Sequence, residues 1–410
     1  MSRNMFRQTT MLSGMVEFIR SGGAPLGWAV AGAALVAGAA VPGQASATNF
    51  TCSYNAGSGA WTTPGDWSSC NGTFPGNSGG NTFDATISNG GNVSLTTPNT
   101  AGALVIGSGS LNISGGNLAT FTGAATKSGT LGLDRFSSQG GSSLTIGGTL
   151  NNSGFTLIQD ASGTQTANST LTAGGLNNTG TITVQGDSGF QSAMVVGAAA
   201  PGISTGTVNL SGNALLQYTG GAITSIGTGA QINEVGANAR VAIASASTTN
   251  SALTTLASNA GQLLLQSGRT LTTTTGLTNS GILGVDRFSS QGGSSLVVGG
   301  TLANSGLVLV QDASGNQTAN STLTAAGLNN TGTIALQGNS GFQSALAVNG
   351  AATNSGTANI SASSAITVTG AAYTQAAGGH QRYRHAHRAH RRRHRRHAAR
   401  HRHRTGRAEQ

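Results

Sequence analysis

The sequence predicts an all-β protein whose chain winds as a parallel β-helix, and three observations carry that prediction. The body of the chain, residues 48–379, is rich in Gly, Ser, Thr, Asn and Ala and poor in charge. Short runs such as SLTIGG, TITVQG and LVLVQD alternate apolar and polar residues, which is the period of a half-buried strand. Asn-Ser/Thr-Gly triplets precede such runs about every 25 residues, a spacing typical of a solenoid.

The positions of the triplets predict where successive coils begin. Complete triplets begin at Asn152, Asn178, Asn279, Asn304, Asn330 and Asn354. Degenerate versions begin at Lys127, Ser204 and Gly227, and two coils fit the gap that follows, with a weak marker near Asn250 or Asn259. Neither the regular leucine frame nor the helical segments of a leucine-rich repeat are present. Parallel β-helix coils fit better, because Gly and Asn suit their tight corners.

A long internal duplication supports whole coils as the repeating unit. Residues 128–196 and 280–348 are related by an offset of 152 residues without a gap, and about 54 of 69 positions are identical. We therefore expect six coils per offset, and roughly a dozen coils in a rod on the order of 60 Å long, with strands stacked about 4.8 Å apart. Inward Val, Ile and Leu form the expected core. Stacked asparagines, Asn152 on Asn178 or Asn304 on Asn330, are expected to form side-chain amide ladders.

The first 47 residues predict a secretion signal. Basic residues precede an apolar run from Leu26 to Val41, and Ala45-Ser46-Ala47 supplies small residues for cleavage. The alternative is a membrane anchor, for which the run is short. We expect residues 1–47 to be a signal peptide and the mature chain to cross the inner membrane.

Residues 48–83 differ in composition from the coils that follow. They contain Trp61, Trp67 and the chain's two cysteines, Cys52 and Cys70. We predict an amino-terminal cap here, because an open solenoid end invites edge pairing, with the β-helix proper at 84–379. The alternative is a ligand-binding module that uses the two Trp as a sugar platform. An exported chain meets an oxidising compartment, so a disulfide between the cysteines is expected, with free thiols as the alternative.

The last segment, residues 380–410, is composed almost entirely of His, Arg and Ala and holds twelve Arg. The body has five basic and eight acidic residues, so the high pI belongs to this tail and predicts no specific nucleic-acid partner for the body. Read one base later, GC-rich His and Arg codons give alternating Thr and apolar residues. We therefore interpret the tail as an out-of-frame continuation of the solenoid. Translated as written, it would be disordered and would bind polyanions or metal ions non-specifically.

Several stretches resemble a known family. GAWTTPGDWSSC, TFDATISNGGNVSLTT, AGALVIGSGSLNISGG and GAAYTQAAGG are similar to parts of bacterial autotransporter and filamentous-haemagglutinin-like passengers. The resemblance implies a right-handed β-helix exported by type V secretion and displayed at the cell surface, outer membrane or outside the cell. Adhesion to a host or cell-surface glycan or protein receptor is the role it implies. It also implies an outer-membrane translocating barrel, which we do not find in this chain, so a truncated product would stay in the periplasm.

The body offers little for catalysis. It contains no His, which excludes Ser–His and Cys–His nucleophile systems, and no phosphate-binding or zinc motif. We therefore predict no enzyme activity, no metal and no cofactor. One set of carboxylates recurs about once per coil, at Asp134, Asp160, Asp187, Asp286 and Asp312.

Three interpretations of these carboxylates remain open. We favour solvated turns, because their distance from each triplet drifts, and because Arg135 and Arg287 could pair with the preceding Asp. The others are a Ca²⁺ or sugar contact and a catalytic acid–base pair. The expected function is a non-enzymatic adhesive or structural surface passenger. The alternatives are a β-helix glycan hydrolase or lyase, and polyanion or metal binding through the tail.

Overall fold

The computed structural model describes residues 48–76, 80–160, 164–312, 316–339, 341–361, 363–370 and 372–375. These residues belong to one compact unit that begins at Ala47. The predicted signal peptide (1–47) and the tail (380–410) lie outside the described residues. Among the described residues there is no α-helix, and the helical turns are three short 3-10 helices, η1 (Pro64–Asp66), η2 (Ala244–Ala246) and η3 (Ser251–Leu253).

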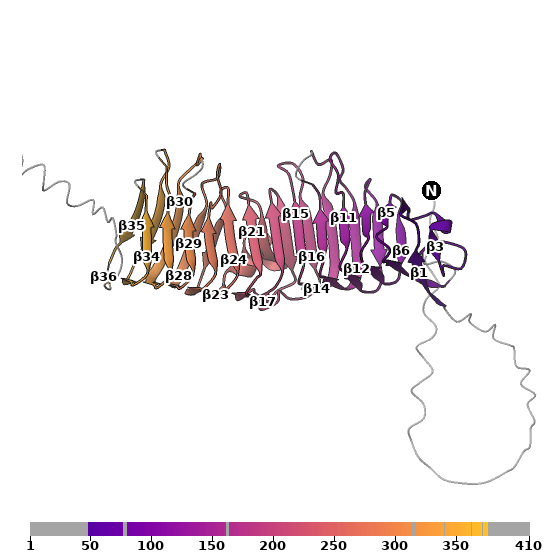
Figure 1. Cartoon of the computed structure of the whole chain (residues 1–410), viewed down its shortest axis with the longest axis horizontal. Coiled ribbons are helices and arrows are strands. Elements are labelled where there is room, and N and C mark those ends of the chain that lie inside the picture. Colours follow the sequence, from indigo (N-terminus) through magenta and orange to yellow (C-terminus); the bar gives the residue numbers. More distant parts are fainter. Residues whose placement is uncertain are drawn as a thin grey trace, which may run out of the picture. The chain divides into compact units, whose positions relative to one another are not determined.

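The strands form three long sheets (Figure 1). The amino-terminal sheet contains β1 (Asn49–Tyr54), β3 (Trp67–Ser68), β4 (Thr82–Ile87), β6 (Asn99–Ala101), β7 (Leu104–Ile106), β9 (Leu118–Phe121), β10 (Ala125–Lys127), β12 (Ser143–Asn152), β14 (Ser169–Asn178), β16 (Ser192–Val196), β19 (Ala214–Tyr218) and β22 (Arg240–Ile243). The continuous sheet contains β2 (Ser58–Ala60), β5 (Asn92–Leu95), β8 (Ser110–Ile113), β11 (Thr130–Leu133), β13 (Phe155–Ile158), β15 (Thr181–Gln185), β18 (Thr207–Ser211), β21 (Gln231–Val235), β24 (Gln262–Gln266), β27 (Ile282–Val285), β29 (Leu307–Val310), β31 (Thr333–Leu336) and β34 (Thr357–Ile360). The carboxy-terminal sheet contains β17 (Ile203–Ser204), β20 (Ser225–Ile226), β23 (Ser258–Asn259), β25 (Thr270–Thr273), β26 (Leu277–Asn279), β28 (Ser295–Asn304), β30 (Ser321–Asn330), β32 (Ser344–Val348), β33 (Ala352–Asn354), β35 (Ser364–Val368) and β36 (Tyr373–Gln375).

Each coil contributes three strand segments, which confirms the predicted parallel β-helix. The first half of β12 pairs in parallel with β9 and β14, its second half pairs with β10, and β13 follows in the continuous sheet. β12 changes register between Ile146 and Thr149. Glycine is needed at this corner, because a Cβ on Gly147 would lie 2.4 Å from the carbonyl oxygen of Thr122. Gly299 sits at the equivalent corner of the second copy, where a Cβ would lie 2.6 Å from the Thr273 carbonyl oxygen.

The coil count follows the sequence prediction. Along the continuous sheet, β27 lies six strands after β11, so the 152-residue offset equals six coils. The gap after Gly227 holds two coils, and its marker is Asn259, which pairs with Ile226 and Asn279. The duplication therefore copied whole coils and kept every strand in register.

One of the interior columns, at the end of the second strand of the coils, contains stacked asparagines in several successive coils. Asn152 donates to Asn178 at 2.6 Å, and Asn304 donates to Asn330 at 2.7 Å, which confirms the two expected amide ladders. The second ladder extends further than expected, through Asn259, Asn279, Asn304, Asn330, Asn354 and Gln375. Each such hydrogen bond contributes about 1 kcal/mol, and an amide left unpaired in this buried column would cost more.

Lys127 heads the first ladder in place of an asparagine. Its ammonium donates to Asn152 Oδ1 at 2.5 Å, and its neighbour in the preceding coil is the apolar Ile106. The side chain is 1% exposed, and this burial lowers the pKa of Lys127 from 10.5 to about 8. The buried amine completes the column where the coil before it offers no amide.

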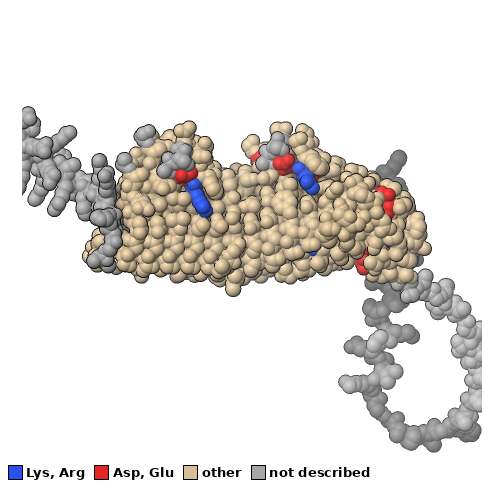
Figure 2. Space-filling view, viewed as in Figure 1, with Lys and Arg blue, Asp and Glu red and all other residues tan. Residues whose placement is uncertain are grey.

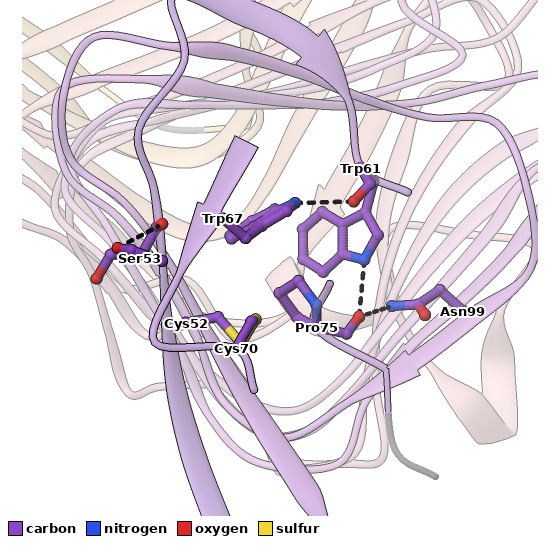
Figure 3. Close-up of a disulfide and its surroundings, with 8 residues drawn as sticks. Cys52, Ser53, Trp61, Trp67, Cys70, Pro75 and Asn99 are labelled. Carbon is purple, nitrogen blue, oxygen red and sulfur yellow. Dashed lines mark hydrogen bonds between the residues drawn. A yellow bond between two sulfur atoms is a disulfide. The ribbon is translucent and has the colours of Figure 1, made fainter. Parts of the chain in front are cut away.

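The amino-terminal end is closed by the segment that carries the tryptophans (Figure 3). β1 and β2 already pair in parallel with β4 and β5, so the first coil begins at Asn49 and not at residue 84. The short β3 then pairs antiparallel with β1 at the edge of the sheet. This antiparallel strand ends the parallel ladder, as the cap prediction requires of a solenoid terminus.

The two tryptophans are core residues, which makes the sugar-platform alternative wrong. Trp61 is 0% exposed and Trp67 is 6% exposed, and their rings stack edge-on at 4.9 Å. The Trp61 indole donates to the carbonyl of Pro75, and the Trp67 indole donates to the carbonyl of Trp61 (Figure 3). A disulfide joins Cys52 and Cys70 beside them.

Candidate ligand-binding surface

The structure does not assemble the five predicted carboxylates into one ladder. Ile158 pairs with Leu133, so Gln159, and not Asp160, follows in register with Asp134. The drift after each triplet therefore separates the carboxylates, as the sequence indicated. Among the described residues no group of three or more His, Cys, Asp or Glu is placed to hold a metal ion.

Two of these carboxylates are not solvated turn residues, so that interpretation is wrong for Asp134 and Asp286. Both are fully buried. Asp134 accepts hydrogen bonds from the Ser142 amide (2.8 Å), the Ser142 hydroxyl (2.7 Å) and the Ser169 hydroxyl of the next coil (2.7 Å). These bonds clamp the residues from 134 to 142 to the following coil.

The second copy repeats this clamp and adds one donor. Asp286 accepts from the Ser294 amide and hydroxyl, each at 2.8 Å, and from the Ser321 hydroxyl at 2.5 Å. The Ser267 amide of the preceding coil donates to it at 2.7 Å. Neither aspartate pairs with the arginine that follows it, contrary to one sequence interpretation, because among the described residues the sole ion pair is Arg269–Glu234.

The remaining predicted carboxylates are partly exposed. Asp187 accepts from the backbone amides of Gly189, Phe190 and Gln165 at 2.7–2.9 Å. Burial acts to raise the pKa of Asp187, but these three donors outweigh it and lower the pKa below its usual value. Asp160 and Asp312 lie in equivalent half-buried positions at the end of β13 and β29.

The clamped loops present an arginine and a phenylalanine at the surface. The Arg135 guanidinium lies 5.5 Å from the centre of the Phe136 ring, and Arg287 lies 5.6 Å from Phe288. Phe136 is 54% exposed and Phe288 is 46% exposed, which is unusual for phenylalanine. The two loops also share their backbone, since both have positive φ at the Asp and at the second Ser.

A glycine on the continuous sheet makes room for each arginine. A Cβ on Gly132 would lie 3.0 Å from Cδ of Arg135, so the arginine stem packs directly over this strand. In the second copy, Gly284 has the same relation to Arg287, with 3.4 Å to Cδ. The sequence signal for this site was the run DRFSSQGGSSL, which is identical in both copies. From this run, the sequence analysis considered only the Asp as a candidate site residue.

Of the five basic residues of the described coils, Lys127 and Arg269 are buried, and Arg135, Arg240 and Arg287 are half-buried. Arg240 donates to the backbone carbonyls of Ser247 and Asn238. Figure 2 shows basic and acidic side chains together at two places on one edge of the rod, separated by an uncharged stretch. Positive charge therefore reaches this surface at two equivalent positions.

A second polar site, which the sequence analysis missed, consists of Glu234 on β21 with Asn250 and Arg269, and we call it the seam cluster. Glu234 is fully buried, and its carboxylate accepts from Arg269 Nε at 2.8 Å and from the Asn250 amide at 2.6 Å. Burial raises the pKa of Glu234, while Arg269, Asn250 and a backbone amide act against that rise. The inward alternation of Ile232 and Glu234 on β21 was the available signal, since an inward carboxylate requires a partner.

This seam cluster is structural. Asn250 Oδ1 and the Ser251 hydroxyl accept from the backbone amides of Val241 and Ile243, which are edge donors of β22. A cavity of about 420 Å³ opens beside it, lined mainly by threonines. The Arg269 guanidinium donates through Nε to Glu234 and through Nη1 to the Ala237 carbonyl. Asn250 and Ser251 thus satisfy two backbone amides at the β22 edge.

In the described part of the chain, the buried carboxylates of Asp134, Asp286 and Glu234 each accept hydrogen bonds from fixed donors. The half-buried Arg135 and Arg287 each stand beside an exposed phenylalanine ring. Within the described residues, no helix is long and apolar enough to span a membrane. No family model matches the chain, and neither a curated protein nor a solved structure matches it.

Proposed function

We propose that this chain is a non-enzymatic, exported surface passenger that binds its target through the side of the β-helix. The observation that carries the proposal is the pair of equivalent loops, each of which exposes a phenylalanine beside a half-buried arginine. Aromatic side chains and arginine are enriched at binding interfaces. A rigid solenoid supports them at fixed positions, which reduces the entropy that binding must overcome.

The sequence supports the export part of the proposal. An amino-terminal signal pattern precedes the cysteine-containing segment, and the coils resemble autotransporter-like passengers. Adhesion to a cell-surface receptor or a structural role at the cell surface follows from that resemblance.

The competing proposal is a glycan hydrolase or lyase. It would need an acid–base pair, and the carboxylates Asp134 and Asp286 are buried behind serine donors while Asp187 is held by backbone amides. This arrangement supports binding without turnover.

The test compares binding and turnover on the same full-length chain. Immobilised cell-surface glycans and cell-surface proteins are probed for retention of the chain, and the same glycans are assayed for new reducing ends or unsaturated ends. We expect retention without cleavage, and we expect Asp160→Asn/Asp312→Asn to change neither. Cleavage that is lost in this double variant would overturn the proposal in favour of the enzyme.

A further inference from the structure

The two arginine–phenylalanine loops stand on a common line along the continuous sheet. Gly132, which lies under Arg135, pairs with Leu157 in the next coil. Gly284, under Arg287, pairs likewise with Leu309. Both positions belong to a single outward-facing column of the same sheet, six coils apart. At about 4.8 Å per coil, the two loops are about 29 Å apart.

Each loop is flanked on this sheet by outward apolar side chains of the following coil. We define patch 1 as Arg135, Phe136, Phe155 and Leu157, and patch 2 as Arg287, Phe288, Leu307 and Leu309. Phe155 is 36% exposed, and both leucines of β29 are partly exposed. Each patch therefore combines one guanidinium with an apolar platform.

The sheet surface between the patches is uncharged and mostly polar. From Phe155 the column continues through Thr181, Thr207, Gln231 and Gln262, which are paired in register and partly exposed, and it reaches Leu307 through the partly exposed Ile282. Their hydroxyl and amide groups both donate and accept hydrogen bonds. This track connects the two patches without crossing a charged side chain of the described sheet.

Arg135 has Asn112 Oδ1 at 3.3 Å as a hydrogen-bond partner, and the ion pair among the described residues, Arg269–Glu234, involves neither patch arginine. Acidic side chains stand beside the basic ones at both places (Figure 2), so each patch offers its guanidinium within a surface of mixed charge. A guanidinium binds a carboxylate through two parallel hydrogen bonds. The neighbouring ring and leucine offer a surface on which the apolar C–H face of a sugar ring can pack.

We propose that patches 1 and 2 are paired subsites for one linear acidic polysaccharide, whose uronate carboxylates bind Arg135 and Arg287 and whose intervening hydroxyls lie along the polar track. This assignment rests on the proposed function and names its ligand class. A nucleic acid fits less well, because the body has five basic against eight acidic residues and cannot match a dense phosphate backbone. Two sites on one rod make binding bivalent, so a polymer that spans both gains affinity over either patch alone.

The experiment uses the full-length chain and polygalacturonate, with neutral dextran as the control polymer. Because the arginine-rich segment 380–410 can bind any polyanion, the readout is local hydrogen–deuterium exchange at residues 134–142 and 286–294. We expect polygalacturonate to slow exchange at both loops and dextran to leave both unchanged. We expect galacturonate oligomers shorter than about 29 Å to protect each loop at least tenfold less well at equal uronate concentration.

Variants then separate the subsites. Arg287→Gln/Phe288→Ser should abolish protection at 286–294 and weaken it at 134–142 roughly tenfold, because the polymer loses its second anchor. Leu118→Ser is the matched control, since Leu118 is 53% exposed but lies on β9, outside both patches. It should leave both loops protected.

Three results would overturn the ligand class alone, and a fourth would remove the proposed function with it. One is protection confined to residues 380–410, and another is equal protection of the loops by dextran. The third is patch-dependent retention on a protein-coated surface with no effect of polygalacturonate. That third outcome would replace the ligand class while the proposed surface-binding function stands, whereas failure of retention on every surface would remove both.

Discussion

Lys127 and Asn279 stand immediately before the two copies of the duplicated block, at the same position of the interior column. In that column Lys127 follows Ile106, whereas Asn279 follows Asn259 and accepts a hydrogen bond from its amide at 2.7 Å. The two copies therefore have similar coils, but the coil that precedes each copy is different. The preceding coil decides whether an amide or an amine suits the next position.

The arginine of each patch shows the same dependence on the preceding coil. Asn112 lies before patch 1 and hydrogen-bonds Arg135, whereas Leu264 occupies the equivalent position before patch 2. A Cβ on Gly284 would lie 2.8 Å from Leu264 Cδ2. In a solenoid each coil contacts only its neighbours, so identical sequences acquire different properties at the junctions alone.

The largest expected effect comes from removing a loop clamp. Asp286→Ala leaves four donors without an acceptor, and Asp134→Ala leaves three. We expect a local loss of about 3 kcal/mol or more at Asp286, and a smaller loss at Asp134. Hydrogen exchange of peptides that span each loop measures both. Equal losses would show that the Ser267 amide does not contribute.

Asn152 and Asn304 occupy equivalent positions of the interior column, so alanine substitutions there compare the two copies directly. Asn304→Ala removes amide hydrogen bonds and should cost about 2 kcal/mol. Asn152→Ala should cost more, about 3 kcal/mol, because it also leaves the buried Lys127 ammonium without its acceptor. Urea unfolding of the two variants gives the difference. A smaller cost at Asn152 would contradict the role assigned to Lys127.

Lys127→Asn places an asparagine immediately before the first copy, as Asn279 stands before the second. Because burial lowers the pKa of Lys127 to about 8, the folded state at pH 7 holds a disfavoured charge, and the substitution should stabilise the chain by about 2 kcal/mol. Between pH 8 and 10.5 the unfolded wild-type chain binds more protons than the folded chain, so wild-type stability rises with pH. The stability difference between variant and wild type should therefore shrink across this window. A constant difference in urea midpoint would show that Lys127 does not titrate there.

The smallest expected effect is on patch 1. Asn112→Leu copies the environment of patch 2 and should change stability by no more than about 0.5 kcal/mol. It frees Arg135 from its neutral partner, so protection of residues 134–142 by polygalacturonate should strengthen. Leu264→Asn is the reciprocal variant and should weaken protection of residues 286–294. Effects of the same sign in the two variants, or no change of protection in either, would contradict the role of the preceding coil.

The strand pattern and the coils were predictable because period-2 alternation and the Asn-Ser/Thr-Gly triplets are local signals. The same triplets predicted the amide column at Asn152 and Asn304, since one position per coil must stack when the offset is a whole number of coils. The sequence also placed a degenerate triplet at Lys127, although nothing local indicated that its amine would be buried.

The loops were not predictable in the same way. Asp134 reads as a solvated turn residue, and its burial depends on Ser169, which the next coil supplies. The seam at Glu234 and Arg269 likewise joins residues 35 positions apart through an inserted loop. Such contacts depend on how loops of neighbouring coils fold over one another, which no short sequence period encodes.

The distance between the two loops tests the central claim most directly, because the whole-coil duplication and the paired subsites both depend on it. Spin labels on Ser137→Cys and Ser289→Cys, both exposed positions, report that distance by pulsed electron resonance. Six coils predict one narrow distribution centred at about 29 Å, allowing for the length of the labels. A broad distribution, or a centre near the 24 or 34 Å that five or seven coils would give at about 4.8 Å each, would contradict the account.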